Sequence, residues 1–439
     1  MDTLIHIIFD CIHGSHIVTW RKVAFKCTLA IDKQTIRDRL LPTQLAVGVS
    51  CGAEVMVHAA RHWIHQNRQR DNCVLLQKDI RNAFNELLPH EFLKDAQQHA
   101  PASARFAAYC YGRPSNLVYQ GTVERCSRGQ QGCPIMGPLF CLTRQRMVEE
   151  ARELSSRNPP EFEPAFADDA FAGGNVDDVF EAFHQELQLA HKYGLHVEPS
   201  KCTLYLLAGD QFRGDVSKFQ ALGVHVVTGT DVMMLKTPIG DSPTFLHSFH
   251  PQKLSEFSSL CSMFHLLPHV HVAYYLFRCG GTVSKLQWWC RTTPRVHLSQ
   301  LLQDFHDVQK QTLETFLGQP LTTHQWTQAK LPTKLGGLGL VSTRTEIGLD
   351  VVSLPDLGFL ASHRRCSPHI HQLLGSQPAP NLYKCEGPAV QHLTACLPDM
   401  ASVFRDPQAQ VDHKTVLQRI HRQVHTGLFN NRIWQDRLG

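Results

Sequence analysis

The stretch Phe162–Gly174, FEPAFADDAFAGG, decides how this chain folds. Two short apolar runs flank Asp168 and Asp169, which predicts two strands of a hairpin with the aspartates at its turn. Side chains alternate along a strand, so these two carboxylates cannot share one face of a regular strand. A turn can present both of them to solvent or to a metal. An aspartate-rich β-turn without any ligand explains the stretch equally well, because Asp tolerates turn conformations.

The composition describes an ordinary globular chain of two or three domains. Its 439 residues are 43% hydrophobic and 19% charged, which excludes a disordered chain. The net charge of +4 neither requires nor excludes a nucleic-acid partner. The 15 cysteines contain no C-x-x-C pair, which favours a reducing, intracellular compartment, nuclear or cytoplasmic. No apolar run fits a signal peptide or the ~20 residues of a membrane span, so we expect neither secretion nor a membrane.

A second carboxylate segment precedes the hairpin. Residues 73–80 form a short apolar run with β-branched character, which predicts a buried strand with Asp79 near its carboxyl end. Ligands bind at this edge in open α/β sheets. The alternative is helix capping, since Asp79 or Asn82 can cap a helix over residues 83–88.

A glycine- and proline-rich loop lies between the two carboxylate segments. Residues 127–140, SRGQQGCPIMGPLF, cannot form regular structure and are predicted to open a helix over residues 138–156. Such a loop allows close approach of the backbone to a phosphate or a base, although structural glycine loops are common. After the hairpin, Asn175 is predicted to cap a helix that ends at Gly194. With strands expected over 203–208 and 222–227, these elements predict an α+β domain with a small, largely antiparallel sheet.

The second half of the chain is predicted to be helical. Apolar residues recur at helical spacing over 252–267, 269–279, 283–290 and 298–317. From Lys236 to Arg344, ten Lys and Arg stand against five Asp and Glu, a net charge of +5 (10 − 5). A basic helical module suits a protein that tracks a phosphate backbone, although a solvated charged face explains it nearly as well. The remaining residues are also predicted to be helical, with a linker near 376–380.

The order of these segments combines them into one hypothesis. Carboxylates such as Asp79, Asp168 and Asp169 supply the hard oxygen ligands that Mg²⁺ prefers. Two such ions ~3.5–4 Å apart activate a 3′-hydroxyl and stabilise a leaving pyrophosphate. The three carboxylates meet only if the strand and the hairpin are neighbours in one sheet.

Taken in order, the motifs resemble those of reverse transcriptases of the non-LTR, LINE-like retrotransposon type, over roughly residues 20–345. Asp79 to Phe84 is similar to the family's D-x-x-N-A-F motif, and residues 166–169 match its [FY]-x-D-D box. Residues 41–52 resemble the family's fingers segment, and residues 129–140 its nucleotide-facing loop. Residues 194–202 resemble its G-L-x-x-N-x-x-K motif, and residues 222–223 its primer grip.

The resemblance implies a right-hand polymerase. Residues 1–70 would form shortened fingers, and residues 71–235 an antiparallel-sheet palm with an intervening fingers segment around 95–125. Residues 236–345 would form a helical thumb, and residues 346–439 a helical C-terminal extension of unknown role. The implied activity is that of an RNA-directed DNA polymerase, which extends a primer 3′-OH with dNTPs by a two-metal-ion mechanism. Its partners would be an RNA template and a DNA primer; no oligomeric state is indicated. The competing hypothesis is a catalytically degenerate, nucleic-acid-binding relict of a retroelement.

The resemblance also implies roles for single residues. The implied ligands of two Mg²⁺ ions, or of Mn²⁺ in their place, are Asp79, Asp168 and Asp169. Phe84 is the implied steric gate that crowds a ribose 2′-OH. The implied contacts to the incoming nucleotide and template are Gln131 and Gly132. Lys201 is the implied general acid that protonates pyrophosphate. A structural lysine, whose aliphatic stem lies in the core while its ammonium reaches water, explains the residue equally well.

The chain departs from the family pattern in three places. Cys133 stands where many relatives carry Asp, which is expected to affect loop packing, and Glu198 replaces the usual Asn. Residues 20–24 are a shortened version of the R-P-I-A fingers motif, so weaker binding of the triphosphate is expected. With no recognisable endonuclease, RNase H or Cys-His knuckle motif, a fragment or a degenerate copy is a further expectation.

Overall fold

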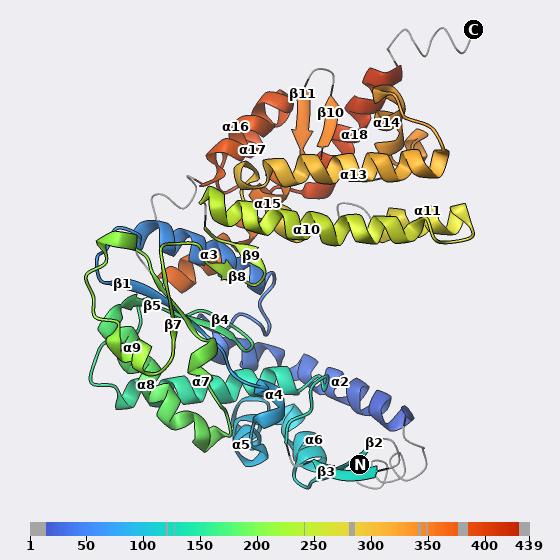
Figure 1. The fold of residues 1–439 in the computed structure, drawn as a ribbon. Helices are drawn as coiled ribbons and strands as arrows, with labels where there is room; N and C mark the ends of the chain where they lie inside the picture. The colour runs from blue at the N-terminus through green and yellow to red at the C-terminus, as the bar shows by residue number, and fades with distance from the viewer. Residues whose placement is uncertain are drawn as a thin grey trace. The chain divides into compact units, whose positions relative to one another are not determined.

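The computed structural model describes residues 15–119, 122–126, 128–240, 242–280, 286–340, 344–347, 350–375 and 385–429. The chain divides into two compact units (Figure 1). The first, here called the sheet unit, comprises Met1–Ala59, Trp63–Thr230 and Gln372–Gly375. The second, the helical unit, comprises Ala60–His62, Asp231–His371 and Ser376–Gly439. The finer division into fingers, palm, thumb and extension stays a prediction.

A five-stranded sheet forms the centre of the sheet unit, in the order β4-β5-β1-β6-β7. Its strands are β1 Cys73–Lys78, β4 Ala165–Phe166, β5 Asp169–Asn175, β6 Thr203–Leu206 and β7 His225–Thr228. All neighbouring strands are antiparallel except β6 and β7. The continuous apolar run at the start of β1 is fully buried, as expected for a central strand. The predicted α+β domain with a small, largely antiparallel sheet is therefore confirmed.

Two helices of the sheet unit, over 136–154 and 176–193, match the helices predicted over 138–156 and from Asn175 to Gly194. The helices of this unit are α2 Ser15–Leu40, α3 Gly52–Asn67, α4 Ala83–Glu86, α5 Pro89–His99, α6 Pro101–Tyr111, α7 Met136–Leu154, α8 Val176–Tyr193 and α9 Ser217–Ala221. A short hairpin, β2 Ser115–Tyr119 and β3 Thr122–Cys126, follows α6. The Asn175 side chain accepts the Asp177 N–H at 2.9 Å, and Gly194 ends α8 with a φ of 77°. Both predicted caps of α8 are therefore confirmed.

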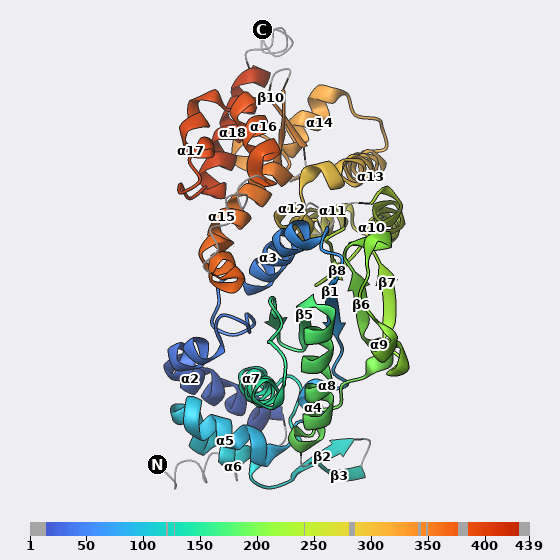
Figure 2. The ribbon, with the colours of Figure 1, turned by 90° about the vertical axis from the view of Figure 1, so that its left-hand side faces the viewer.

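The two faces of the sheet are covered differently. Val74 and Leu76 of β1 pack in one apolar cluster with Val179 and Phe183 of α8. α7 and α8 lie side by side on that side of the sheet (Figure 1 and Figure 2). On the opposite face, a Cβ atom on Gly173 would lie 2.5 Å from the Trp63 ring, so this strand position requires glycine.

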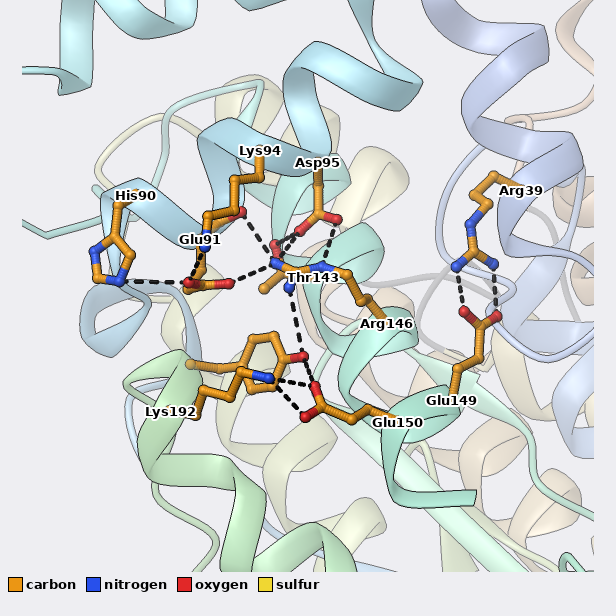
Figure 3. A network of polar contacts seen from close by, with 11 residues as sticks. Arg39, His90, Glu91, Lys94, Asp95, Thr143, Arg146, Glu149, Glu150 and Lys192 are labelled. Carbon is orange, nitrogen blue, oxygen red and sulfur yellow. Dashed lines mark hydrogen bonds and ion pairs between the residues drawn. The ribbon is translucent and has the colours of Figure 1, made fainter. Parts of the chain in front are cut away.

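A network of ion pairs fastens α7 to its neighbours (Figure 3). The Arg146 guanidinium donates to Asp95 of α5 at 2.9 Å and to Glu91 of α5 at 2.8 Å. Two further pairs, one from α2 and one from α8, end on the same helix: Arg39 with Glu149, and Lys192 with Glu150. Because α7 begins directly after the glycine-rich loop, this network holds the base of that loop in place.

The helical unit consists mainly of nine helices among the residues that the structure describes. They are α10 Pro243–Phe264, α11 Val270–Gly280, α12 Gln287–Thr292, α13 Ser299–Leu317, α14 Thr323–Lys330, α15 Leu354–Leu374, α16 Gly387–Cys396, α17 Ala401–Arg405 and α18 His413–Phe429. Two short hairpins accompany them: β8 Met233–Met234 with β9 Thr237–Pro238, and β10 Arg344–Ile347 with β11 Asp350–Ser353. None of the described helices has both the length and the apolar character that crossing a membrane requires.

One prediction for the second half of the chain was wrong. The segment from 346 onward was expected to be helical apart from a linker near 376–380, but β10 and β11 pair as an antiparallel hairpin at its start. Val351 and Val352 are β-branched and favour a strand over a helix, which explains the difference. The predicted linker near 376–380 and the start of the helix predicted over 283–290 lie outside the described residues.

Candidate active site

Two of the three predicted carboxylates meet at one end of the sheet. β1 and β5 pair antiparallel, with Cys73 opposite Asn175 and Lys78 opposite Ala170. One further step of this register places Asp79 opposite Asp169. Directly opposed residues of an antiparallel pair lie on the same face, with Cβ atoms roughly 4.5–5.5 Å apart. By strand alternation that face is the one turned away from α8.

The third carboxylate, Asp168, lies in the turn that joins β4 to β5. Phe166 pairs with Asp169, so the turn contains only Ala167 and Asp168. The prediction that both aspartates lie at the turn is therefore wrong for Asp169, which is the first residue of β5. Ala167 has a φ of 57°, a left-handed conformation that is unfavourable for a residue with a side chain. Surrounding contacts must hold this turn in place.

Gln44, in the loop between α2 and α3, supplies those contacts. Its side-chain oxygen accepts the Ala167 N–H at 2.9 Å, and its side-chain nitrogen donates to the Ala167 carbonyl at 3.2 Å. The backbone of the same loop bonds to the hairpin too, since the Leu45 N–H donates to the Ala165 carbonyl at 2.8 Å. Gln44 is 1% exposed, so its amide is committed to these bonds. The sequence marked this segment as a fingers motif but assigned Gln44 no role.

The segment that contains Lys201 precedes β6, which flanks β1 on the side opposite β5, and its backbone bonds to Asp79. The Glu198 N–H donates to the Asp79 carbonyl at 3.1 Å, and the Asp79 N–H donates to Cys202 Sγ at 3.4 Å. Lys201 ends a short 3₁₀ helix, Pro199–Lys201, and its side chain is exposed. Lys201 therefore lies near the carboxylate end of the sheet, with its ammonium in reach of solvent.

The glycine-rich loop is fastened to α4, which follows Asp79. Gly129 packs so tightly that a Cβ atom there would lie 2.1 Å from the Phe84 carbonyl oxygen. The Gln131 N–H donates to the Asn85 side chain at 3.1 Å, and Arg128 donates to the Glu86 carbonyl at 2.5 Å. The loop and the first carboxylate segment are therefore one structural element, although more than 40 residues separate them in the chain.

The residues predicted to face a nucleotide differ in how firmly they are held. The Phe84 ring is half-buried against Phe140, with ring centroids 5.0 Å apart. Gln131 is anchored through its backbone while its side chain is exposed. Gly132 has a φ of 85° and open space where a Cβ would point. Asn82 precedes α4 without a side-chain capping bond, so side-chain capping does not explain this residue.

The carboxylates on the two faces of the sheet have opposite electrostatic settings. Among the residues that the structure describes, no cation forms an ion pair with Asp79 or Asp168. Behind them, the buried Lys78 ammonium lies 3.1 Å from Glu163 and 2.5 Å from Glu186. Burial alone would raise the pKa of Glu163, but Lys78 and Arg152 outweigh burial and hold that pKa well below its usual range.

No preformed metal cage exists in the described part of the chain, where no three His, Cys, Asp or Glu side chains are arranged to hold an ion. Mg²⁺ is commonly bound by one or two carboxylates, with water and substrate phosphates as its other ligands. Asp79 and Asp169, opposed on one face, fit that mode of binding. The predicted three-carboxylate metal site itself stays a prediction.

Comparisons with known proteins assign no family to the chain. No family model and no curated protein matches it. Among solved structures, it is similar to telomerase from Candida albicans in complex with the TWJ fragment of telomeric RNA, with a TM-score of 0.40 and 10% sequence identity. The match covers 88% of this chain and 58% of the telomerase chain. Similarity at this level is too low to decide the fold or the function, and non-LTR membership stays a prediction.

Proposed function

We propose that this chain is a nucleotidyltransferase with a right-hand polymerase fold, an RNA-directed DNA polymerase that extends a primer 3′-OH with dNTPs. One observation carries the proposal: the register of β1 and β5 ends with Lys78 opposite Ala170, so the next residues, Asp79 and Asp169, lie at the same end of the sheet, with Asp168 in the adjoining turn. These segments, 89 residues apart in the chain (168 − 79), match the family's two carboxylate motifs in type and in order.

The carboxylates are the groups of this chain that would hold divalent metal. Their oxygen atoms lie at a solvent-accessible end of the sheet, on Asp79, Asp168 and Asp169. Among the described residues, no basic side chain forms an ion pair with Asp79 or Asp168 that a metal ion would have to displace. Bound Mg²⁺ would supply Lewis-acid activation of the primer hydroxyl and charge stabilisation on the leaving pyrophosphate. Gln44 holds the turn that contains Asp168, so the Asp168 carboxylate is in position before the substrate binds.

The segment around α4 would bind the nucleotide. Phe84 is fixed against Phe140, and a fixed ring can exclude a ribose 2′-OH where a mobile side chain would yield. Gln131 keeps its side chain for the nucleotide because its backbone makes the anchoring bond. Gly132 lets a base or sugar approach the backbone closely. Lys201, exposed near the same sheet end, would donate a proton to the departing pyrophosphate.

The proposed partners are an RNA template and a DNA primer. The net charge of +5 between Lys236 and Arg344 suits a surface that follows phosphates. The rest of the chain is close to neutral, with a net charge of −1 (4 − 5), so the positive charge is concentrated in the segment predicted to be the thumb.

Primer extension on poly(rA)/oligo(dT) with Mg²⁺ tests the proposal. We expect wild-type protein to incorporate dTTP and Asp168→Asn to lose at least about 10³-fold in rate, as loss of a catalytic group usually does. Asp210→Asn is the matched control, because Asp210 is an exposed aspartate of the sheet unit in the short 3₁₀ helix Gly209–Gln211. It is expected to keep full activity.

Equal rates for wild type and Asp168→Asn would refute the proposal. A wild-type chain that binds the hybrid with a steep salt dependence but extends no primer would also refute it, and would identify the degenerate nucleic-acid-binding relict instead.

A further inference from the structure

A cysteine, a histidine and a glutamate come together in the helical unit, and none of them belongs to the proposed active site. His363 lies on α15, and Cys385 and Glu386 directly precede α16. The sulfur of Cys385 is 3.5 Å from His363 Nε2, and His363 Nδ1 is 2.7 Å from Glu386 Oε1. One imidazole thus joins a thiol to a carboxylate, which is the arrangement that activates a nucleophile through an oriented base.

Arg364 holds the glutamate in place. Its Nε donates to Glu386 Oε2 at 3.1 Å, while its terminal nitrogens donate to backbone carbonyls at and after α17: Val403 at 2.9 Å, Phe404 at 2.5 Å and Ala409 at 3.1 Å. The side chains of His363, Arg364 and Glu386 are each only 1–3% exposed. The imidazole therefore has a fixed orientation toward Cys385.

Glu386 and Cys385 contact the two ring nitrogens of His363. Burial alone would lower the pKa of His363, but hydrogen bonds to Cys385 and Glu386 outweigh burial and raise that pKa to about 9. Because Glu386 engages Nδ1, Nε2 is the nitrogen that can exchange a proton with the Cys385 sulfur.

We propose that Cys385 is a nucleophile activated by the His363 imidazole, and that it is a modification site for hydrogen peroxide and other small electrophiles. Cys385 is half-buried, so a small reagent can reach it. The Cys385 sulfur attacks one peroxide oxygen, and the S–O bond forms as the O–O bond breaks. The thiol proton passes by way of His363 Nε2 to the departing hydroxide, which leaves as water. Cysteine is thereby oxidised to sulfenic acid and the peroxide is reduced.

The other cysteines provide internal comparisons. Burial raises the pKa of Cys73, Cys141 and Cys290 to about 12, so these thiols are inert near neutral pH. Cys396 has a related setting, 3.7 Å from His392 Nε2, whose Nδ1 lies 2.7 Å from Asp356. The His392 side chain is 25% exposed, against 2% for His363, so water screens that pair more strongly.

The test is the pH dependence of alkylation in the full-length protein. Iodoacetamide is added at pH 6.5, 7.5 and 8.5, and the rate at each cysteine is followed by peptide mass spectrometry. The exposed thiols Cys27 and Cys279 serve as accessible references. A thiol slows about tenfold for each pH unit below its pKa. We expect Cys385 to react at least about tenfold faster than both references at pH 6.5, where an ordinary thiol is slow. A Cys385 rate at pH 6.5 that does not exceed that of the references would overturn the proposal.

Two further measurements separate the imidazole's role from simple accessibility. In His363→Asn, the alkylation rate of Cys385 at pH 6.5 is expected to fall to that of Cys27 or below, with folding checked by circular dichroism. If that variant does not fold, the wild-type series still decides. With substoichiometric hydrogen peroxide and dimedone, the sulfenic acid label is expected on Cys385. A label that favours Cys27 and Cys279 would contradict the proposal.

Discussion

The two faces of strand β1 carry carboxylates in opposite circumstances. Lys78 and Asp79 are adjacent in the chain, yet alternation sends them to opposite faces of the sheet. On the α8 side, Lys78 lies between Glu163 and Glu186, and all three side chains are buried. On the other side, Asp79 is half-buried without an ion-pair partner among the described residues.

This difference separates carboxylates that stabilise the fold from carboxylates left for a ligand. A buried charge must be compensated, so Glu163 and Glu186 are committed to Lys78 and Arg152. A carboxylate at an accessible sheet end is hydrated and needs no partner for folding. Neighbouring carboxylates repel one another until a cation joins them. We therefore expect substitutions on the two faces to affect different properties of the protein.

The largest difference is expected between Lys78→Met and Asp79→Asn. Lys78→Met leaves two buried carboxylates with insufficient compensation and is expected to lower the free energy of unfolding by about 3–5 kcal/mol. Asp79→Asn is expected to change it by less than about 0.5 kcal/mol while abolishing primer extension. Urea unfolding followed by circular dichroism measures both values. Equal losses of stability in the two variants would show that the faces do not divide in this way.

Local patterns in the sequence predicted the elements but not the contacts that complete the site. The β1 run, the periodicity of α8 and its caps at Asn175 and Gly194 are local signals, and each was found where predicted. The bonds from Gln44 to Ala167 span 123 residues. Such contacts depend on how distant segments pack, which residue spacing does not encode.

The same reasoning explains the other residues that the sequence left unassigned. Strand alternation predicts that Lys78 and Asp79 face opposite ways, but it cannot name Glu186, which is 108 residues further along the chain. Asp169 was misplaced because Phe166 pairs with Asp169, which puts the two-residue turn at Ala167 and Asp168, one residue before the position that would hold both aspartates. For Asp79 and Asp168, the order of the motifs, and not any single local feature, is the basis of the predicted shared site, which stays a prediction.

A smaller effect is expected from Gln44→Ala, which tests whether the exposed carboxylates depend on a buried support. The substitution leaves the Ala167 N–H and carbonyl without their partners and is expected to cost about 1–3 kcal/mol of stability. Because the turn also loses its fixed geometry, kcat is expected to fall while the KM for dTTP stays near the wild-type value. Thermal unfolding and steady-state primer extension measure these effects.

Gln34→Ala is the matched control, since Gln34 is an exposed glutamine of α2 that bonds only locally, to Asp38. It is expected to change neither stability nor kcat. A Gln44→Ala protein that loses stability but keeps the wild-type kcat would make Gln44 a residue of the fold alone, and would remove it from the positioning of Asp168.

The smallest effect is expected from acid, through the buried carboxylate Glu163. The pKa of Glu163 is held below its ordinary value of 4.5, so its stabilising contribution is complete above pH 4.5 and is lost as the pH falls toward the folded-state pKa. Between pH 4.5 and 3.5 this loss amounts to about 1 kcal/mol. Glu163→Gln is expected to lose that much less stability than wild type over the same interval, measured by urea unfolding at each pH. An unchanged acid dependence in Glu163→Gln would mean that Lys78 and Arg152 do not hold this carboxylate in its ionised form, and the contrast between the two faces of β1 would then rest on burial alone.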